Sequence, residues 1–365
     1  MFSKPPQRWS EDKAWSWYDA NPWFIGANFL PSTAINQLEM FQCDTYARDR
    51  GVLIRELDWA QALGFNSLRV FLHDLLWEHE REDFFRTLDD FLQLCDERGI
   101  RPLLVFFDDC HRPEPHYGLQ PETVLGYHNP GWAQSPGVPT LIDEWRWSRL
   151  ERYVKAVLNN YGRDSRVLCW DLFNEPLNAG FDNNKHKLPY SLRLLKHIWH
   201  WARECNPEQP LTTCVWSHPD PTKVHAEESL NESEQLMLEA QRYSLEASDI
   251  ISFHNYGNTE SLAARINSLK PLSRPLICTE YMARTAGSTF QSSLPLLHKE
   301  KVAAYNWGFV WGKSQTIHPW YSPIGAPEPA VWFHDIYRPD GTPFDEEETA
   351  LITRLTHKSV QSVGC

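Results

Sequence analysis

The chain has 365 residues, of which 42% are hydrophobic and 23% charged, a composition that supports a large core and excludes a disordered or fibrous protein. Its net charge of −13 and the lack of a basic cluster argue against a nucleic-acid partner. The longest apolar run, residues 102–107, is too short to span a membrane. The first residues lack the apolar segment of a signal peptide, so we expect a cytoplasmic protein.

Short apolar runs alternate with amphipathic helical stretches from one end of the chain to the other. The predicted strands are residues 23–28, 66–72, 101–107, 167–173, 210–216, 250–254, 275–280 and 303–310. The predicted helices are residues 52–63, 84–97, 141–161, 191–205, 232–247, 261–269, 294–300 and 346–355. This alternation predicts a closed parallel (β/α)8 TIM barrel, with residues 1–365 as a single domain. An open doubly wound sheet is the alternative, although no G-x-G-x-x-G or P-loop follows any strand.

Two connections are long and rich in proline and aromatic residues. One follows strand three, from Asp108 to about Thr140, and the other follows strand eight, from Gly312 to about Asp345. Both lie on the C-terminal face of a barrel, where active sites are built. We expect them to fold over opposite sides of a cleft and to turn it into a pocket.

The cysteines have no CxxC spacing, and three of them lie in predicted strands: Cys169, Cys214 and Cys278. This pattern favours buried free thiols over disulfides or a zinc site.

Two of the predicted strands end on a glutamate. The fourth runs into Asn174-Glu175-Pro176, where Pro176 favours an extended backbone at Glu175, and the seventh ends on Glu280. Both carboxyl groups face the barrel mouth from opposite sides, an arrangement suited to flanking one glycosidic bond. A separation of about 5 Å between them would indicate a retaining mechanism, and one of about 6.5 to 9.5 Å an inverting mechanism.

This pattern resembles glycoside hydrolase family 5 and the related cellulase-like retaining glycosidases of the (β/α)8 clan. The resemblance covers most of the chain and rests on five matches in order: Arg69 at the end of strand two, Asn174-Glu175-Pro176, His254-Asn255-Tyr256 after strand six, Glu280, and Asn306-Trp307 in strand eight. It implies that Glu175 is the acid/base, with a pKa raised toward neutrality, and that Glu280 is the nucleophile.

The resemblance also implies roles for the surrounding residues. Arg69 would keep Glu280 ionised, and Tyr256 would donate a hydrogen bond to the same carboxylate. Asn174 would bind the sugar 2-hydroxyl, and His254 would lie near the acid/base or the sugar hydroxyls.

The strand-eight tryptophan carries two further expectations from the resemblance. Trp307 would form the floor under the reacting sugar, and its peptide bond to Gly308 would be strained, as a cis bond. Lys313, just beyond, would reach sugar hydroxyls further along the cleft.

The sequence departs from the family pattern after strand three. The family has Asp-x-His there, whereas this chain has Asp108-Asp109-Cys110-His111, so Cys110 occupies the place of the histidine. Either His111 substitutes for it or the subsite differs. Other candidates for sugar contacts, with solvated or helix-capping roles as the alternative, are Asp108, Asp109, His73, Asp74 and Trp77.

We therefore expect a retaining β-glycosidase that needs neither metal nor cofactor and acts on a neutral or weakly charged β-linked saccharide in exo mode. An endo-acting enzyme of cellulase, mannanase or xylanase type is the alternative. Two other hypotheses are a metal-dependent barrel hydrolase that uses Asp108, Asp109, His111 and His254, and a carbohydrate-binding barrel that has lost catalysis. The identity of the sugar and the oligomeric state stay open at the level of sequence.

Overall fold

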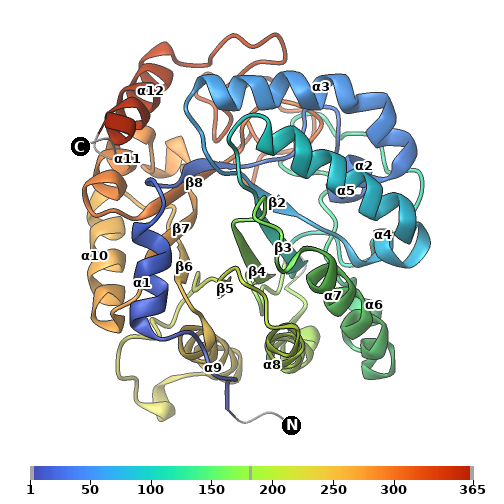
Figure 1. Cartoon of the computed structure of the whole chain (residues 1–365), viewed down its shortest axis with the longest axis vertical. Helices are drawn as coiled ribbons and strands as arrows, with labels where there is room; N and C mark the ends of the chain where they lie inside the picture. Colours follow the sequence, from blue (N-terminus) through green and yellow to red (C-terminus); the bar gives the residue numbers. More distant parts are fainter. Residues whose placement is uncertain (1–3, 181–182, 362–365) are drawn as a thin grey trace.

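The computed structural model describes residues 4–180 and 183–361. Its eight strands are all parallel and have the order β5-β4-β3-β2-β1-β8-β7-β6 (Figure 1). Their bounds are β1 (Ile25–Asn28), β2 (Arg69–Phe71), β3 (Leu103–Asp108), β4 (Cys169–Asn174), β5 (Leu211–Thr212), β6 (Ile251–His254), β7 (Leu276–Tyr281) and β8 (Ala303–Trp307). The predicted TIM barrel is confirmed, and the open doubly wound sheet is wrong.

The barrel closes between β5 and β6 through a short contact. Val215 forms a parallel bridge with Phe253, and its amide donates to the Ser252 carbonyl at 3.0 Å. The Val215 carbonyl in turn accepts from the His254 amide at 3.1 Å. These bonds leave the ring of strands without an open edge at this point, which is how barrels avoid exposed strand edges.

Helices surround the strands (Figure 1). The α-helices are α1 (Glu11–Asp19), α2 (Gln37–Phe41), α3 (Cys43–Ala62), α4 (Asp74–His79), α5 (Arg81–Asp96), α6 (Val138–Leu141), α7 (Trp147–Tyr161), α8 (Leu188–Cys205), α9 (Glu232–Ala247), α10 (Thr259–Leu269), α11 (Phe290–Lys299) and α12 (Glu346–Gln361). The bounds of α9 agree with the prediction, because Asn231 and Glu234 form a capping box that fixes where it begins. The short helices α1, α2 and α4 were not predicted, since none has the long apolar repeat that marks a helix in sequence.

The strands carry two hydrophobic layers because alternate residues point to opposite sides of the barrel wall. In β3, Leu103 and Val105 belong to a cluster inside the barrel, whereas Leu104 and Phe106 pack in the layer beneath the helices. Trp307 at the end of β8 belongs to the inner cluster, together with Trp132 from the loop after β3. The inner layer therefore leads directly up to the C-terminal mouth.

The two long loops meet each other and do not lie on opposite sides, contrary to the expectation. The Asn129 amide donates to the Ser314 carbonyl at 2.8 Å, and the Gly325 amide donates to the Leu125 carbonyl at 2.8 Å. In the ring of strands, β1 and β2 lie between β3 and β8, so the joined loops cross the mouth above β1 and β2. We call residues 109–137 and 308–345 together the joined wall.

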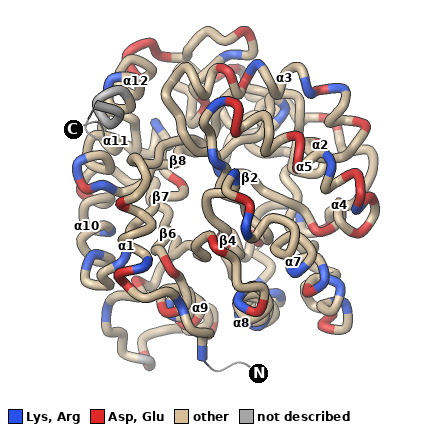
Figure 2. Tube along the Cα trace, in the orientation of Figure 1, with Lys and Arg blue, Asp and Glu red and all other residues tan. Residues whose placement is uncertain are grey.

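Acidic and basic residues are interspersed over the outer helices (Figure 2). Among the described residues, no helix has both the length and the apolar character that crossing a bilayer demands. Seven free cysteines are described, and Cys169, Cys214 and Cys278 are buried as predicted.

Candidate active site

A cavity of about 530 Å³ opens at the C-terminal ends of the strands. Seven of the predicted site residues line it: His111, Asn174, Glu175, His254, Tyr256, Glu280 and Trp307. The remaining lining includes four aromatic residues from loops, Trp132, Trp216, Trp320 and Tyr321. The strand ends thus bring together residues that are up to about two hundred positions apart in sequence. The barrel topology predicts this, because the C-terminal ends of all the strands meet at one mouth.

The two glutamates share one histidine. His254 Nδ1 lies 2.8 Å from Glu175 Oε1 and 3.4 Å from Glu280 Oε2. One ligand atom from each of the three side chains lies within 4.8 Å of the other two. The carboxylates therefore face a single small space from β4 and β7.

Glu280 has two strong donors of its own. Arg69 Nη1 donates to Oε1 at 2.8 Å, and the Tyr256 hydroxyl donates to Oε2 at 2.8 Å. Burial raises the pKa of Glu280, and the charge of Glu175 raises it further, while Arg69 and Tyr256 oppose the rise. Because these donors bind Glu280 directly, they stabilise its ionised form.

Arg69 lies fully buried beneath the cavity and does not line it. Its guanidinium also donates to Asp171 at 2.7 Å, Asn174 at 2.6 Å and Asn28 at 2.9 Å. It stands at the beginning of the paired part of β2 and not at its end, because β2 is only Arg69–Phe71. From there the long side chain spans the barrel interior and fixes the Glu280 carboxylate.

The backbone of Glu175 is left-handed, with φ of +42°, and not extended as predicted. Pro176 disfavours the right-handed helical region at Glu175. Glu175 instead adopts the left-handed region as part of a turn. In the turn, the Glu175 amide donates to Cys214 Sγ at 3.3 Å and its carbonyl accepts from the Asn178 amide at 3.1 Å. A left-handed non-glycine residue costs about 1 to 3 kcal/mol and is found mainly at functional sites.

The Glu175 side chain has weaker donors than Glu280. Asn178 Nδ2 donates to Oε2 at 2.8 Å, and the Cys110 thiol donates to the same oxygen at 3.2 Å. Burial raises the pKa of Glu175, and these donors oppose the rise only in part. With no cation bonded to it, Glu175 is the carboxyl suited to carry a proton.

The histidines that line the cavity are neutral at pH 7. Burial lowers the pKa of His254 to about 4, that of His111 to about 3 and that of His128 to about 4. A neutral His254 adds no charge to the carboxylate pair.

The residues after β3 divide between the cavity and its support. Asp108 is buried outside the lining and accepts from Trp132 Nε1 at 2.7 Å and from Asn174 Nδ2 at 2.8 Å. Asp109 accepts from the Leu177 amide at 2.8 Å. His111 lines the cavity, while Cys110 provides the contact to Glu175 at the position where the family has histidine.

The other polar candidates lie away from the cavity lining. Lys313 pairs with Glu39, with Nζ 2.6 Å from Oε1, so its expected contact with the cleft is wrong. His73 caps α4, and Asp74 accepts from Ser135 at 2.8 Å and pairs with an arginine. These groups are helix-capping and structural, which is the alternative stated for them.

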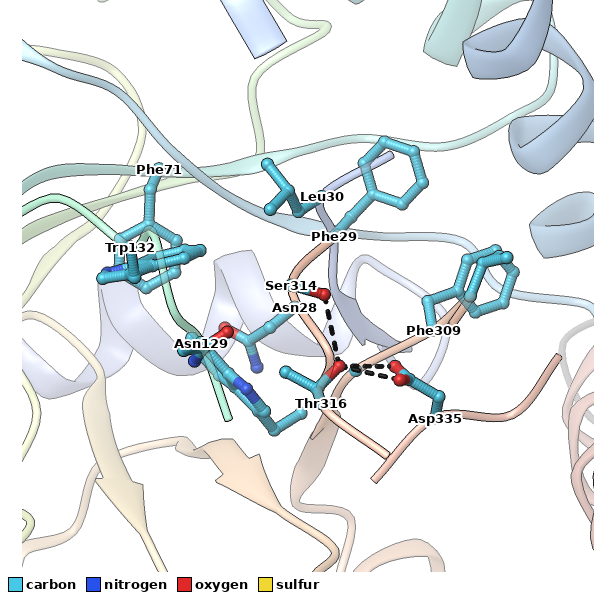
Figure 3. Close-up of a pocket in the computed structure, with 13 residues that line it drawn as sticks. Asn28, Phe29, Leu30, Phe71, Asn129, Trp132, Phe309, Ser314, Thr316 and Asp335 are labelled. Carbon is cyan, nitrogen blue, oxygen red and sulfur yellow. Dashed lines mark hydrogen bonds between the residues drawn. The ribbon is translucent and has the colours of Figure 1, made fainter. Parts of the chain in front are cut away.

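Trp307 lines the cavity beside Trp132, with ring centroids 5.4 Å apart. The two rings also line a small, mainly apolar space of about 20 Å³, at one side of which Thr316 donates to Asp335 at 2.8 Å (Figure 3). Among the described residues the cis peptide bonds are Ser135–Pro136 and His218–Pro219, so the expected cis bond after Trp307 is wrong. Gly308 makes the turn instead, with φ of +79° and no room for a Cβ beside Asp335.

Glu175, His254 and Glu280 could offer three ligand atoms to a metal ion, but Arg69 lies 2.8 Å from the same Glu280 carboxylate and opposes a cation there. In the part of the chain that the structure describes, Asp108, Asp109, His111 and His254 form no such group. Among the described residues, the four side chains named for a metal-dependent hydrolase therefore do not come together as a ligand group.

Several lining residues were not predicted. Asn178 follows Glu175 by three positions, and the turn that places it depends on the left-handed Glu175. Trp216 lies beyond the short β5, and Arg265 belongs to α10. In the sequence, a tryptophan near a strand end only weakly indicates a binding site, and an arginine in a helix does not indicate one.

Comparison with known proteins gives the fold. No family model and no curated protein sequence matches the chain. Among solved structures, the Rhizomucor miehei endo-1,4-beta-mannanase is 12% identical with a TM-score of 0.59, over 93% of this chain and 95% of that one. The exo-beta-1,4-mannosidase of Opitutaceae bacterium strain TAV5 is 16% identical with a TM-score of 0.59, over 99% of this chain and 62% of that one.

A third structure is a GH5_18 protein from Streptomyces cattleya in complex with Manb1-4GlcNAc. It is 12% identical with a TM-score of 0.60, over 93% of this chain and 81% of that one. The chain thus has the cellulase-like (β/α)8 fold of the glycoside hydrolase family 5 mannanases and mannosidases.

Proposed function

We propose that the protein is a retaining β-glycosidase with Glu175 as acid/base and Glu280 as nucleophile. The observation that carries the proposal is the asymmetric carboxylate pair: one oxygen of Glu175 lies within 4.8 Å of one oxygen of Glu280, and of the two carboxylates only Glu280 is bonded to Arg69. Retaining enzymes hold their carboxyl groups about 5 to 5.5 Å apart, whereas inverting enzymes need more room for a water molecule.

The geometry gives each group its task. Glu280 attacks the anomeric carbon while the Glu175 proton passes to the leaving oxygen, so the glycosidic bond breaks and a glycosyl ester forms on Glu280. Glu175 then removes a proton from water, which attacks the anomeric carbon and releases Glu280. The neutral His254, 2.8 Å from Glu175, changes the charge of neither step.

We infer a β-mannoside as the first substrate to test, since the solved structures of the same fold are mannanases and mannosidases. An exo mode is supported by the joined wall, which closes the side of the mouth above β1 and β2. A cleft that is closed on one side accepts a chain end more readily than a chain interior. Endo action is the competing mode, because the neighbours include endo-acting mannanases.

The catalytic roles are tested with Glu175→Ala and Glu280→Ala, and with the exposed Glu246→Ala as a matched control. Glu280→Ala should lose nearly all turnover. Glu175→Ala should lose far more activity on poor leaving groups than on activated aryl glycosides, because a good leaving group needs little protonation. Equal losses on both substrate types would refute the acid/base role, and a product of inverted anomeric configuration would refute retention.

The mode of attack is tested on soluble β-mannan, with viscosity and products followed together. An exo enzyme should release a single small sugar while viscosity falls slowly. A fast fall in viscosity with mixed oligosaccharides would establish endo cleavage.

A further inference from the structure

Arg265 is a cavity-lining arginine without a close partner. It lies on α10, its side chain is 15% exposed, and its Nη1 is buried with no hydrogen-bond partner among the described residues. The nearest acidic group is Asp220, with Oδ1 3.6 Å from Nη1, beyond hydrogen-bonding distance. Nη1 therefore lies on the Asp220 side of the guanidinium and has no acceptor within hydrogen-bonding distance, which is unusual for a buried donor.

Asp220 is already bonded to other groups. The same Oδ1 accepts from the Thr222 amide at 3.0 Å and from the Thr222 hydroxyl at 2.7 Å, and Oδ2 lies 3.7 Å from Lys223 Nζ. By contrast, the buried Arg284 binds Glu348 at 2.6 Å. Asp220 therefore holds Arg265 only weakly, and the arginine lines the cavity without an acceptor bonded to its guanidinium among the described residues.

Arg265 is also the permanent cation of the cavity lining among the described residues. The lining histidines His111, His128 and His254 are neutral at pH 7, and Arg69 lies beneath the cavity. The charges that face Arg265 are Asp220 behind it and the carboxylate pair across the cavity. A ligand that carries an oxyanion near Arg265 would gain a charge-assisted, two-point contact.

The position of Arg265 assigns the contact to one side of the substrate. In the ring of strands, β5 and β6 lie across from β1 and β2, so α10 stands across the mouth from the part of the joined wall above β1 and β2. Another part of the wall reaches the β6 side, where the Trp320 and Tyr256 ring centroids are 5.1 Å apart. On the proposed function, the reacting sugar rests on Trp307 next to that wall. The leaving group then extends toward Arg265 and Trp216.

We propose that Arg265 forms a subsite for an oxyanion, a carboxylate or a sulfate ester, on the leaving-group part of the substrate. This inference rests on the proposed function for its orientation. A single acidic substituent next to the scissile bond fits a protein of net charge −13, which would repel a polyanionic chain.

Binding and turnover test the subsite separately. Glucuronate, glucose 6-sulfate and glucose are titrated into the protein, with tryptophan fluorescence as the signal since Trp216 lines the same cavity. At least one anion should bind about tenfold tighter than glucose, and Arg265→Gln should abolish the difference. The exposed Arg86→Gln is the charge-matched control and should keep it.

Turnover is measured on paired aryl β-glycosides whose leaving group carries a meta-carboxylate or a meta-carboxamide. The carboxylate should raise kcat/KM by about tenfold in the wild type, and the ratio should fall to near one in Arg265→Gln. Equal affinity for anions and glucose would overturn the subsite whatever the turnover. If the protein prefers an anion but hydrolyses no glycoside, the proposed subsite stands and the proposed glycosidase function is wrong.

Discussion

Replacement of Arg69 by methionine separates the two tasks of this residue. The fully buried guanidinium donates to Asp171, Glu280, Asn28 and Asn174. Loss of one partner of a buried ion pair costs about 3 to 5 kcal/mol, since the remaining carboxylates keep their desolvation penalty. With about 2.1 cal/mol/K of unfolding entropy per residue, the chain has an unfolding entropy on the order of 0.8 kcal/mol/K, so Tm should fall by about 4 to 7 °C.

The same replacement should change the pH dependence of catalysis. Burial already raises the pKa of Glu280, and removal of the opposing Arg69 raises it further. Since the nucleophile must be ionised, the acidic limb of kcat/KM should move to higher pH. The assay is a pH profile on an activated aryl glycoside, next to thermal unfolding.

Arg284→Met is the matched control. Arg284 is also a buried arginine and donates to Glu348 at 2.6 Å and to two backbone carbonyls, but it lies outside the cavity lining. It should lower Tm by a similar amount and leave the acidic limb in place. If the limb stays in place in Arg69→Met, or moves equally in both variants, the electrostatic role of Arg69 is refuted.

Three further outcomes are expected. Reversible methylthiolation of Cys110 should lower activity by about tenfold or more, because the thiol donates to Glu175, the proposed acid/base. Cys110→Ser should resist the reagent and stay active, and inactivation of Cys110→Ser would contradict this. Burial raises the pKa of Glu56 to about 7, above its ordinary 4.5. The contribution of this carboxyl to the free energy of unfolding is therefore fully present below pH 4.5 and is lost as pH rises through 7. Between pH 5 and pH 8 this carboxyl should cost the wild type on the order of 3 kcal/mol of stability, as measured by denaturant unfolding. Glu56→Gln should lack that loss. Gly126→Ala places a Cβ 2.2 Å from the backbone of the facing loop, which should separate the two loops of the joined wall. The ratio of activity on polymer to activity on disaccharide should therefore rise. Gly118→Ala is the control, since Gly118 also has a left-handed φ but faces open space, and it should leave that ratio unchanged.

The sequence was informative where short-range patterns decide the structure. Continuous apolar runs marked all eight strands, and the barrel topology then brought Glu175 and Glu280 to one mouth. These predictions depend on periodicity and on strand order, which are properties of the chain itself.

The remaining features depend on contacts between distant segments. The left-handed turn at Glu175 is held by Cys214 on the next βα unit, and the path of the joined wall depends on bonds between two loops. Lys313 was expected in the cleft because it follows Trp307 closely, but Glu39 near the start of the chain attracts it elsewhere. No local pattern encodes such pairings, and for the same reason Arg265 was missed.

The joined wall bears on the order in which the parts of the site form during folding. The Thr123 hydroxyl donates to the Lys313 carbonyl at 2.6 Å across 190 residues, so the two halves of the wall meet only after nearly the whole chain has been synthesised. Glu175 and Glu280 both precede that point. Contacts of such sequence separation form late in folding, because a large loop must close before they contribute. The bond from Arg69 to Glu280 spans 211 residues, so the support of this carboxylate and the joined wall both form only after distant parts of the chain have met.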